Sequence, residues 1–290
     1  MNFQGTGVAL VTPFREDLSV DFDSLSKLIG YVITGGVDFL VALGTTAETP
    51  TMTAAEKLEV LKFIIQANNK RKPLVVGIGG NNTQEVLDTI AVYPMEDIDG
   101  ILSVVPYYNK PTQEGIYEHF KAIASGTDKP VILYNVPGRT VTNMLPATTL
   151  RLARTCRNIV AIKEASGNMA QCMELVEGAP EHFNVLSGDD DLVLSQAAIG
   201  MKGVISVAAN SYPRTFTTMV NHALKGDFAA ARPLHYNLLP AIKLLFAEGN
   251  PTGVKHVLAE KGLIRNVLRL PLVAASESLR EAFQPYTEAL

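Results

Sequence analysis

The stretch Ile159-Val160-Ala161-Ile162-Lys163-Glu164-Ala165-Ser166-Gly167-Asn168 joins an apolar run to a turn through a single lysine. The apolar run predicts a buried strand, and Gly167 and Asn168 mark the turn that follows it. Lys163 would therefore stand where a buried strand ends, and burial disfavours the charged form of an amine. A neutral amine can attack a ketone and form a Schiff base. The alternative is a structural lysine whose stem packs while its head reaches water.

Similar short apolar runs lie on both sides of this stretch and alternate with segments of helical periodicity. Their near-continuous apolar character is typical of parallel strands that are covered on both faces. The predicted strands are Gly7–Val11, Val37–Leu43, Pro73–Ile78, Gly100–Val105, Pro130–Tyr134, Ile159–Lys163, Phe183–Leu186 and Gly203–Val207. Between them, Asp21–Thr34 and Thr53–Asn68 have helical spacing, and the second opens with a capping-box signature. Eight strand–helix units predict an α/β fold of the (β/α)8 TIM barrel type, whereas a doubly wound sheet would not need eight.

The chain after residue 226 differs because its helical segments have no strand between them. The breaks fall at Gly249-Asn250-Pro251 and at Leu270-Pro271. We therefore expect a barrel domain over residues 1–226 and a C-terminal helical appendage over residues 227–290. The predicted helices of this appendage are Asp227–Glu248, Pro251–Lys261 and Ser276–Leu290.

The composition excludes several classes of protein. The 290 residues are 47% hydrophobic and 19% charged, as in ordinary soluble globular proteins, and the net charge of −4 gives no basic stripe for nucleic acid. Two cysteines, Cys156 and Cys172, cannot form a disulfide framework or a four-ligand zinc site, which favours a reducing, cytoplasmic setting. We expect no signal peptide, since no basic region precedes the first apolar run, and no run approaches transmembrane length.

Reactive side chains follow several of the predicted strands. In a TIM barrel the active site lies at the C-terminal ends of the strands, so these residues should meet at one mouth. The strand-end motifs are Gly44-Thr45-Thr46-Ala47-Glu48, Pro106-Tyr107-Tyr108-Asn109-Lys110-Pro111, Tyr134-Asn135-Val136-Pro137-Gly138-Arg139, Lys163 and Ser187-Gly188-Asp189-Asp190-Asp191. These residues suit chemistry at a carbonyl group. They provide an amine as nucleophile, phenols and hydroxyls that can move protons, and a guanidinium that can bind a carboxylate.

Each motif also has a structural interpretation. The two adjacent tyrosines could anchor an interface, the two threonines could cap the loop that follows them, Tyr134 could be a core residue and Arg139 could lie in a surface turn. Asp189-Asp190-Asp191 could bind a metal, but acidic residues at a helix start more often complement the helix dipole. The five histidines fall on helical or helix-flanking segments, which argues against histidine catalysis and zinc.

Together these motifs resemble those of the dihydrodipicolinate synthase family, pyruvate-dependent lyases of the class I aldolase type. The resemblance runs in order from about Gly5 to Leu272. It implies condensation of pyruvate with L-aspartate 4-semialdehyde in diaminopimelate and lysine biosynthesis, with no cofactor and no metal. It also implies a homotetramer built from two tight dimers.

The resemblance implies four catalytic residues. Lys163 would form the Schiff base with pyruvate, and Tyr134 would pass protons to and from the intermediates. Thr45 and Tyr108 would be the relay partners of that tyrosine, with Tyr108 reaching across the tight dimer into the neighbouring site.

It also implies four substrate-binding residues. Thr46 would hold the pyruvate carboxylate, and Arg139 would bind the carboxylate of aspartate semialdehyde. Gly188 and Ile205 would line the pocket through main-chain and apolar contact.

The sequence departs from the family pattern at two places. Ala47 stands where the family usually has glycine, so the loop would differ if that position needs a positive φ. A feedback site for lysine would use Thr49, Asn81, Glu85 and Tyr107. Ala54 and Lys57 replace histidines found in many inhibited members, and Pro50 is also unusual, so we expect weak inhibition at most.

Three other functions compete with this one. An N-acetylneuraminate lyase or a 2-keto-3-deoxy sugar-acid aldolase would share Lys163 and Tyr134 but would generally lack Arg139. A non-catalytic barrel that binds a small acid would not need the catalytic set. A phosphate-binding barrel isomerase would have a glycine-rich anion site after strands seven and eight, where this chain has aspartates.

Overall fold

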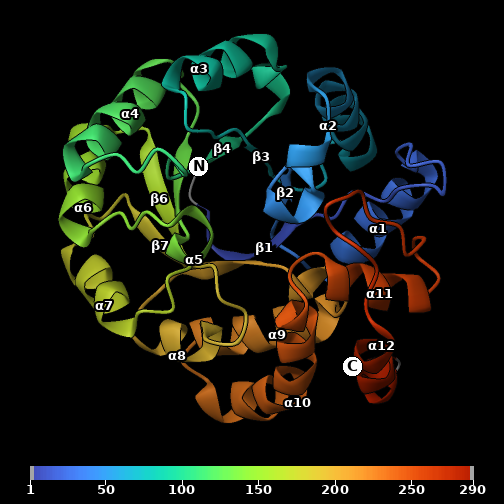
Figure 1. Ribbon diagram of the computed structural model, residues 1–290. Coiled ribbons are helices and arrows are strands. Elements are labelled where there is room, and N and C mark those ends of the chain that lie inside the picture. The colour runs from blue at the N-terminus through green and yellow to red at the C-terminus, as the bar shows by residue number, and fades with distance from the viewer. Residues whose placement is uncertain (1–2, 288–290) are drawn as a thin grey trace.

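The computed structural model describes residues 3–287, and within them eight strands close into a parallel barrel (Figure 1). Each strand pairs with the next, and β1 pairs with β8. The strands are β1 (Gly5–Ala9), β2 (Phe39–Ala42), β3 (Leu74–Gly77), β4 (Gly100–Val104), β5 (Val131–Asn135), β6 (Ile159–Glu164), β7 (Asn184–Ser187) and β8 (Gly203–Ser206). The predicted fold class and all eight strands are confirmed, with ends that differ by a residue or two.

Helices surround the barrel as an outer ring (Figure 1). They are α1 (Phe22–Thr34), α2 (Ala54–Asn68), α3 (Thr83–Val92), α4 (Gln113–Ser125), α6 (Pro146–Thr155), α7 (Met169–Gly178), α8 (Val193–Ala198) and α9 (Pro213–Leu224). The short helix α5 (Pro137–Thr140) lies inside this ring. Short 3-10 turns are η1 (Thr45–Ala47), η2 (Thr49–Thr51), η3 (Met95–Asp97) and η4 (Ala208–Asn210). The predicted capping box is present: the Thr53 hydroxyl accepts from the amide of Glu56, and the Glu56 carboxylate accepts from the amide of Thr53.

The chain after the barrel forms α10 (Phe228–Ala247), α11 (Thr252–Glu260), α12 (Glu277–Phe283) and the 3-10 turn η5 (Gln284–Tyr286). In this region α10 packs on α9 of the barrel, and α12 packs on α10. The predicted last helix is wrong in its length, because the α-helix ends at Phe283. Pro285 has no amide hydrogen to donate, so the chain continues as a 3-10 turn. The rest of that predicted helix, residues 288–290, lies outside the described residues, and the domain boundary near residue 226 stays a prediction.

The apolar interior has two layers. One lies between the strands and the surrounding helices, and the other fills the inside of the barrel. Phe3 and Phe39 pack against each other in the inner layer with ring centroids 5.4 Å apart, and this layer also contains Tyr134 and Ile205. Within the described residues, no helix combines the length and apolar character needed to cross a membrane.

Candidate active site

Lys163 and Tyr134 lie side by side at the ends of β6 and β5. The two residues are register partners in the parallel pair, so both side chains point to the inside of the barrel. Nζ of Lys163 lies 4.4 Å from the centroid of the Tyr134 ring, and the residues are only 6% and 7% exposed. Within residues 3–287 the lysine makes no ion pair with a carboxylate. Its amine therefore faces an aromatic ring and is not held in a salt bridge.

Gly188 provides the space through which the lysine reaches the mouth. A Cβ atom at this position would lie 3.0 Å from Cε of Lys163 and 2.5 Å from Cβ of Ala165. Both separations are too short for unstrained carbon contacts. Any side chain at residue 188 would thus displace the lysine, which gives the predicted pocket-lining residue a specific geometric role.

A buried polar cluster behind the strands fixes this pair. The Glu164 carboxylate, fully buried, accepts from Nδ2 of Asn135 at 3.2 and 3.1 Å, from Nε2 of Gln171 at 3.0 Å and from the amide of Ser166 at 2.9 Å. Asn135 and Glu164 each follow one member of the lysine–tyrosine pair in sequence, and alternation along a strand turns them to the opposite face. By linking the ends of β5 and β6, the cluster holds Lys163 beside the tyrosine. Sequence reasoning did not identify it.

The hydroxyls after β2 lie opposite this pair. Thr45 and Thr46 belong to η1, and Thr46 is only 2% exposed. Nδ2 of Asn250, from the segment between α10 and α11, donates to Oγ1 of Thr46 at 3.0 Å. The C-terminal region therefore reaches the mouth of the barrel, which the sequence did not predict.

The backbone of the mouth adopts left-handed conformations at several residues with side chains. Such conformations cost energy and cluster at functional sites. They follow β2, β4 and β5, at Leu43 (φ 53°), Glu48 (φ 57°), Tyr108 (φ 72°), Lys110 (φ 45°) and Val141 (φ 57°). Ala47, where the resemblance raised the question of a positive φ, lies within η1, and its neighbour Glu48 has the left-handed conformation. Alanine therefore causes no such strain in this loop.

A cavity of about 240 Å³ opens among these groups. The predicted residues that line it are Lys163, Tyr134, Thr45, Thr46, Arg139 and Gly188. Phe246 and Asn250 from the C-terminal region also line it, as does Val207. Ile205, which was predicted to line the pocket, is fully buried in the inner layer of the barrel, two residues before Val207.

A second cavity, of about 800 Å³, adjoins the first. The two share Thr45, Tyr134 and Arg139 in their linings. The predicted lysine-site residues Thr49, Asn81, Glu85 and Tyr107 line the larger one, together with Pro50, Ala54 and Lys57. The structure thus brings the two predicted groups of residues to adjoining cavities.

Arg139 lies on α5, a short helix that begins with Pro137 directly after β5. Its side chain is exposed, lines both cavities and makes no ion pair within the described part of the chain. Its guanidinium is therefore available to a carboxylate that enters the site.

Tyr108 is the predicted catalytic residue that this single chain does not bring to the site. It is 88% exposed and lines neither cavity, whereas Tyr107 is 42% exposed and lines the larger one. Nδ2 of Asn81 donates to the carbonyl of Tyr107 at 3.2 Å, which fixes the loop that carries both tyrosines. The role of Tyr108 across a dimer stays a prediction.

Two of the aspartates after β7, Asp189 and Asp190, lie near the lysine. Burial raises the pKa of Asp189 to about 6, against the hydrogen bond from the amide of Gly167 and the charge of Lys163. Asp190 is 1% exposed, and it accepts from the amides of Val207 and Ala208 at 3.0 and 2.8 Å. These contacts indicate that Asp190 holds the loop after β8.

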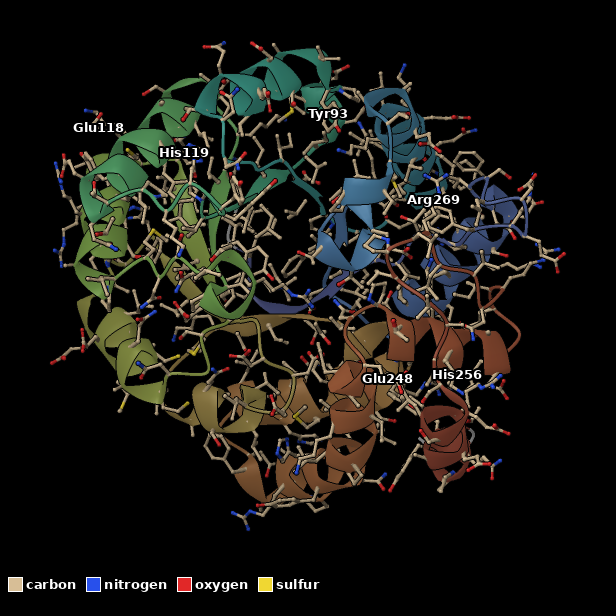
Figure 2. All side chains as sticks on the ribbon, viewed as in Figure 1. Tyr93, Glu118, His119, Glu248, His256 and Arg269 are labelled. Carbon is tan, nitrogen blue, oxygen red and sulfur yellow. The ribbon has the colours of Figure 1, made fainter. Side chains whose placement is uncertain are left out.

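The described residues form no cluster of metal ligands. Across residues 3–287, no group of three or more histidine, cysteine or acidic side chains is placed to hold a metal ion. His119 lies on α4 and His256 on α11, outside the barrel (Figure 2). Burial lowers the pKa of His119 to about 4, so this imidazole is neutral at physiological pH.

Comparisons with known proteins show which family the chain is similar to. A sequence profile of the Dihydrodipicolinate synthetase family matches residues 2–290. The chain is 49% identical over 288 residues to the 4-hydroxy-tetrahydrodipicolinate synthase of Parabacteroides distasonis, covering 98% of this chain and 97% of that protein. It is similar to the crystal structure of dihydrodipicolinate synthase from Aquifex aeolicus, with a TM-score of 0.94, 44% identity and 98% of each chain covered. It is also similar to the Acinetobacter baumannii enzyme complexed with pyruvate, with a TM-score of 0.93, 40% identity and 97% of each chain covered.

Proposed function

The chain belongs to the dihydrodipicolinate synthetase family, and from this membership we propose how its barrel mouth carries out the reaction. The protein is a lyase that condenses pyruvate with L-aspartate 4-semialdehyde in the route to diaminopimelate and lysine. The observation that carries the proposal is the buried Lys163 amine, which lies against the Tyr134 ring and makes no ion pair among residues 3–287. The solved Acinetobacter baumannii relative, which is a complex with pyruvate, supports the choice of first substrate.

The proposed chemistry begins with the lysine. The amine of Lys163 attacks the ketone carbon of pyruvate, and the carbinolamine loses water to give an imine. Loss of a proton from the pyruvate methyl group gives an enamine, whose carbon bonds to the aldehyde carbon of the second substrate. The amino group of that substrate then attacks the imine carbon, closes the ring and releases the lysine. Tyr134, with Thr45 in the same cavity, moves the protons of these steps.

Each of the two substrates carries a carboxylate, and the cavity contains one side chain suited to each of them. Thr46 lies deep in the cavity and would hold pyruvate, whereas Arg139 lies at the junction of both cavities, where the second substrate would enter. Arginine binds a carboxylate through a planar fork with two parallel hydrogen bonds. This arrangement favours an aldehyde that carries a carboxylate over the sugar-like substrates of related lyases.

A coupled assay tests the proposed function. Purified protein is given pyruvate with aspartate semialdehyde, and in parallel pyruvate with N-acetylmannosamine. Turnover of the first pair and not of the second is expected. Preference for the sugar would instead assign the protein to the sugar-acid lyases.

Replacing Arg139 by alanine should lower kcat/KM for aspartate semialdehyde by about 10- to 100-fold, because a charge-assisted hydrogen bond contributes about 1.5–3 kcal/mol. Pyruvate is already bound covalently when the second substrate arrives, so trapping of pyruvate on Lys163 should not change. Steady-state kinetics and borohydride trapping give the two readouts. Arg232→Ala, which removes an exposed arginine from α10, is the matched control. Loss of pyruvate trapping and assembly together would show that Arg139 is structural.

We propose a homotetramer of two tight dimers in which Tyr108 completes the partner's site. A tyrosine with 88% exposure and a strained backbone is unusual unless a second chain covers it. Mixing inactive Tyr108→Phe and Lys163→Ala chains should restore activity, since each mixed dimer would contain one complete site. Random exchange should restore about a quarter of the sites. A mixture that stays inactive although light scattering and mass spectrometry show mixed dimers would contradict the proposal.

Feedback by lysine should be weak. In the larger cavity Glu85 attracts the ammonium group of a lysine ligand, but Lys57 places a cation in the same lining and repels it. A lysine titration of the native protein should show little inhibition, and Lys57→His at pH 8 should strengthen it. Strong, cooperative inhibition of the native protein would show that Asn81, Glu85 and Tyr107 suffice.

The setting that we propose is reducing and cytoplasmic. Cys156 and Cys172 are both free thiols. Burial raises the pKa of Cys172 to about 11, with the charges of Glu164 and Asp189 adding to the effect, so this thiol is unreactive at neutral pH.

A further inference from the structure

We propose that Asn250 is a positioning residue that orients the hydroxyl of Thr46 as a hydrogen-bond donor toward the carboxylate of pyruvate. The proposal rests on the proposed function, in which Thr46 holds that carboxylate. It assigns to the C-terminal region a part in substrate binding, beyond packing on the barrel.

The polarity of one hydrogen bond carries the argument. Nδ2 of Asn250 lies 3.0 Å from Oγ1 of Thr46, and an amide nitrogen can only donate. The threonine oxygen therefore accepts, and its single proton remains for another acceptor. Within residues 3–287 that hydroxyl donates to no protein group. A carboxylate has only acceptors and is the natural partner for such a proton.

The location of the pair supports a role in binding. Thr46 and Asn250 are 2% and 7% exposed, and both line the 240 Å³ cavity that contains Lys163. Oδ1 of Asn250 is buried and without a protein partner. Because Nδ2 faces Thr46, the carbonyl oxygen of Asn250 does not take the Thr46 proton.

A buried ion pair holds the two segments in this relation. Glu48, which follows Thr46 by two residues, pairs with Lys255 at the start of α11, and both side chains are fully buried. Nζ of Lys255 also donates to the carbonyl of Val267 at 2.9 Å and lies 4.2 Å from the centroid of the Phe14 ring. The amide of Arg269 donates to the Glu48 carboxylate at 3.0 Å. The loop after β2 is thus fixed to the same C-terminal segment that provides Asn250.

Figure 2 shows Arg269 where the last part of the chain meets the N-terminal part of the barrel. Its guanidinium donates to the carbonyls of Leu18 and Thr51 and to the carboxylate of Glu56. These contacts fix the C-terminal segment against α2 and the loop before it. Asn250 therefore approaches Thr46 from a rigid support.

The proposal predicts an effect on one substrate only. Asn250→Asp keeps the size of the side chain but replaces the donor by an acceptor, so the Thr46 proton turns toward residue 250 and pyruvate meets a negative charge. The pyruvate KM should rise by at least about tenfold at pH 8, with the aspartate semialdehyde KM within about twofold of the native value. The pyruvate concentration for half-maximal borohydride trapping on Lys163 should rise by the same factor. As the pH falls and the new carboxyl gains a proton that it can donate, the defect should shrink.

Two further variants separate positioning from a structural role. Asn250→Ala should raise the pyruvate KM, but in a Thr46→Val background it should add less than about twofold, because the hydroxyl it orients is gone. Asn237→Ala, which removes an exposed asparagine from α10, should change nothing. If Asn250→Ala does not fold, the isosteric Asn250→Asp carries the test by itself.

The outcomes separate this proposal from the proposed function. Native protein that forms no pyruvate adduct on Lys163 would overturn both. A native adduct with unchanged trapping in the Asn250 variants would overturn only the positioning role. Equal losses for both substrates, or full additivity with Thr46→Val, would also overturn it.

Discussion

Lys163→Arg should lose at least about a thousandfold in kcat/KM, the largest effect that we expect from a single substitution. A guanidinium stays protonated and cannot attack a ketone, so no Schiff base can form. The rest of the site would remain, since Gly188 leaves room for the stem of residue 163 and the Tyr134 ring lies beside its head group. Lys202→Arg, at an exposed position before β8, is the matched control and should keep its activity.

Trapping identifies the reactive amine directly. Borohydride added with pyruvate should attach a reduced pyruvate to Lys163 and abolish activity, and peptide mapping should find the adduct there. An adduct on another lysine, or a fully active Lys163→Arg protein, would rule out the Schiff-base mechanism at this residue.

Lys255→Met should lower the free energy of unfolding by about 3–5 kcal/mol, the largest stability effect that we expect. The substitution leaves the Glu48 carboxylate fully buried without its cation. Burial lowers the pKa of Lys255 to about 8, while the Glu48 charge opposes this, so the amine is still mostly protonated at neutral pH. Urea unfolding at pH 7 measures the change.

Two companion variants test the cause. Lys121→Met removes a lysine of an exposed pair with Glu118 on α4 and should cost less than about 1 kcal/mol. Adding Glu48→Gln to Lys255→Met removes the buried charge, keeps an acceptor for the Arg269 amide and should recover much of the loss. Equal costs for Lys255→Met and Lys121→Met would show that the buried pair contributes no more than a surface pair.

The barrel could be predicted because the sequence signals for its strands and for its mouth lie within short stretches of the chain. Apolar runs give the strands, and the polar residues directly after them, such as Lys163, mark the mouth. The capping box at Thr53 is also a local signal, confirmed in the structure. The end of the last helix was missed because Pro285 competes with a helical pattern that continues past it.

The contacts that could not be predicted join residues far apart in the sequence. Asn250 and Thr46 are separated by 204 residues, and no spacing or motif connects them. The same holds for Glu48 and Lys255, since a lysine in a helical segment normally lies at the surface. Tyr108 is the reverse case: the sequence motif predicts its role, but the structure of a single chain does not test it, because the predicted site belongs to a partner chain.

The left-handed residues around the mouth have a consequence for the energetics of ligand binding. Leu43, Glu48, Tyr108, Lys110 and Val141 hold unfavourable backbone conformations that only the folded protein around them can maintain. The loops that receive the substrates are therefore already in one conformation before either substrate arrives. The conformational entropy of these loops is lost when the protein folds. Binding of pyruvate therefore loses little further chain entropy, and its affinity is set mainly by the bond that forms with the lysine.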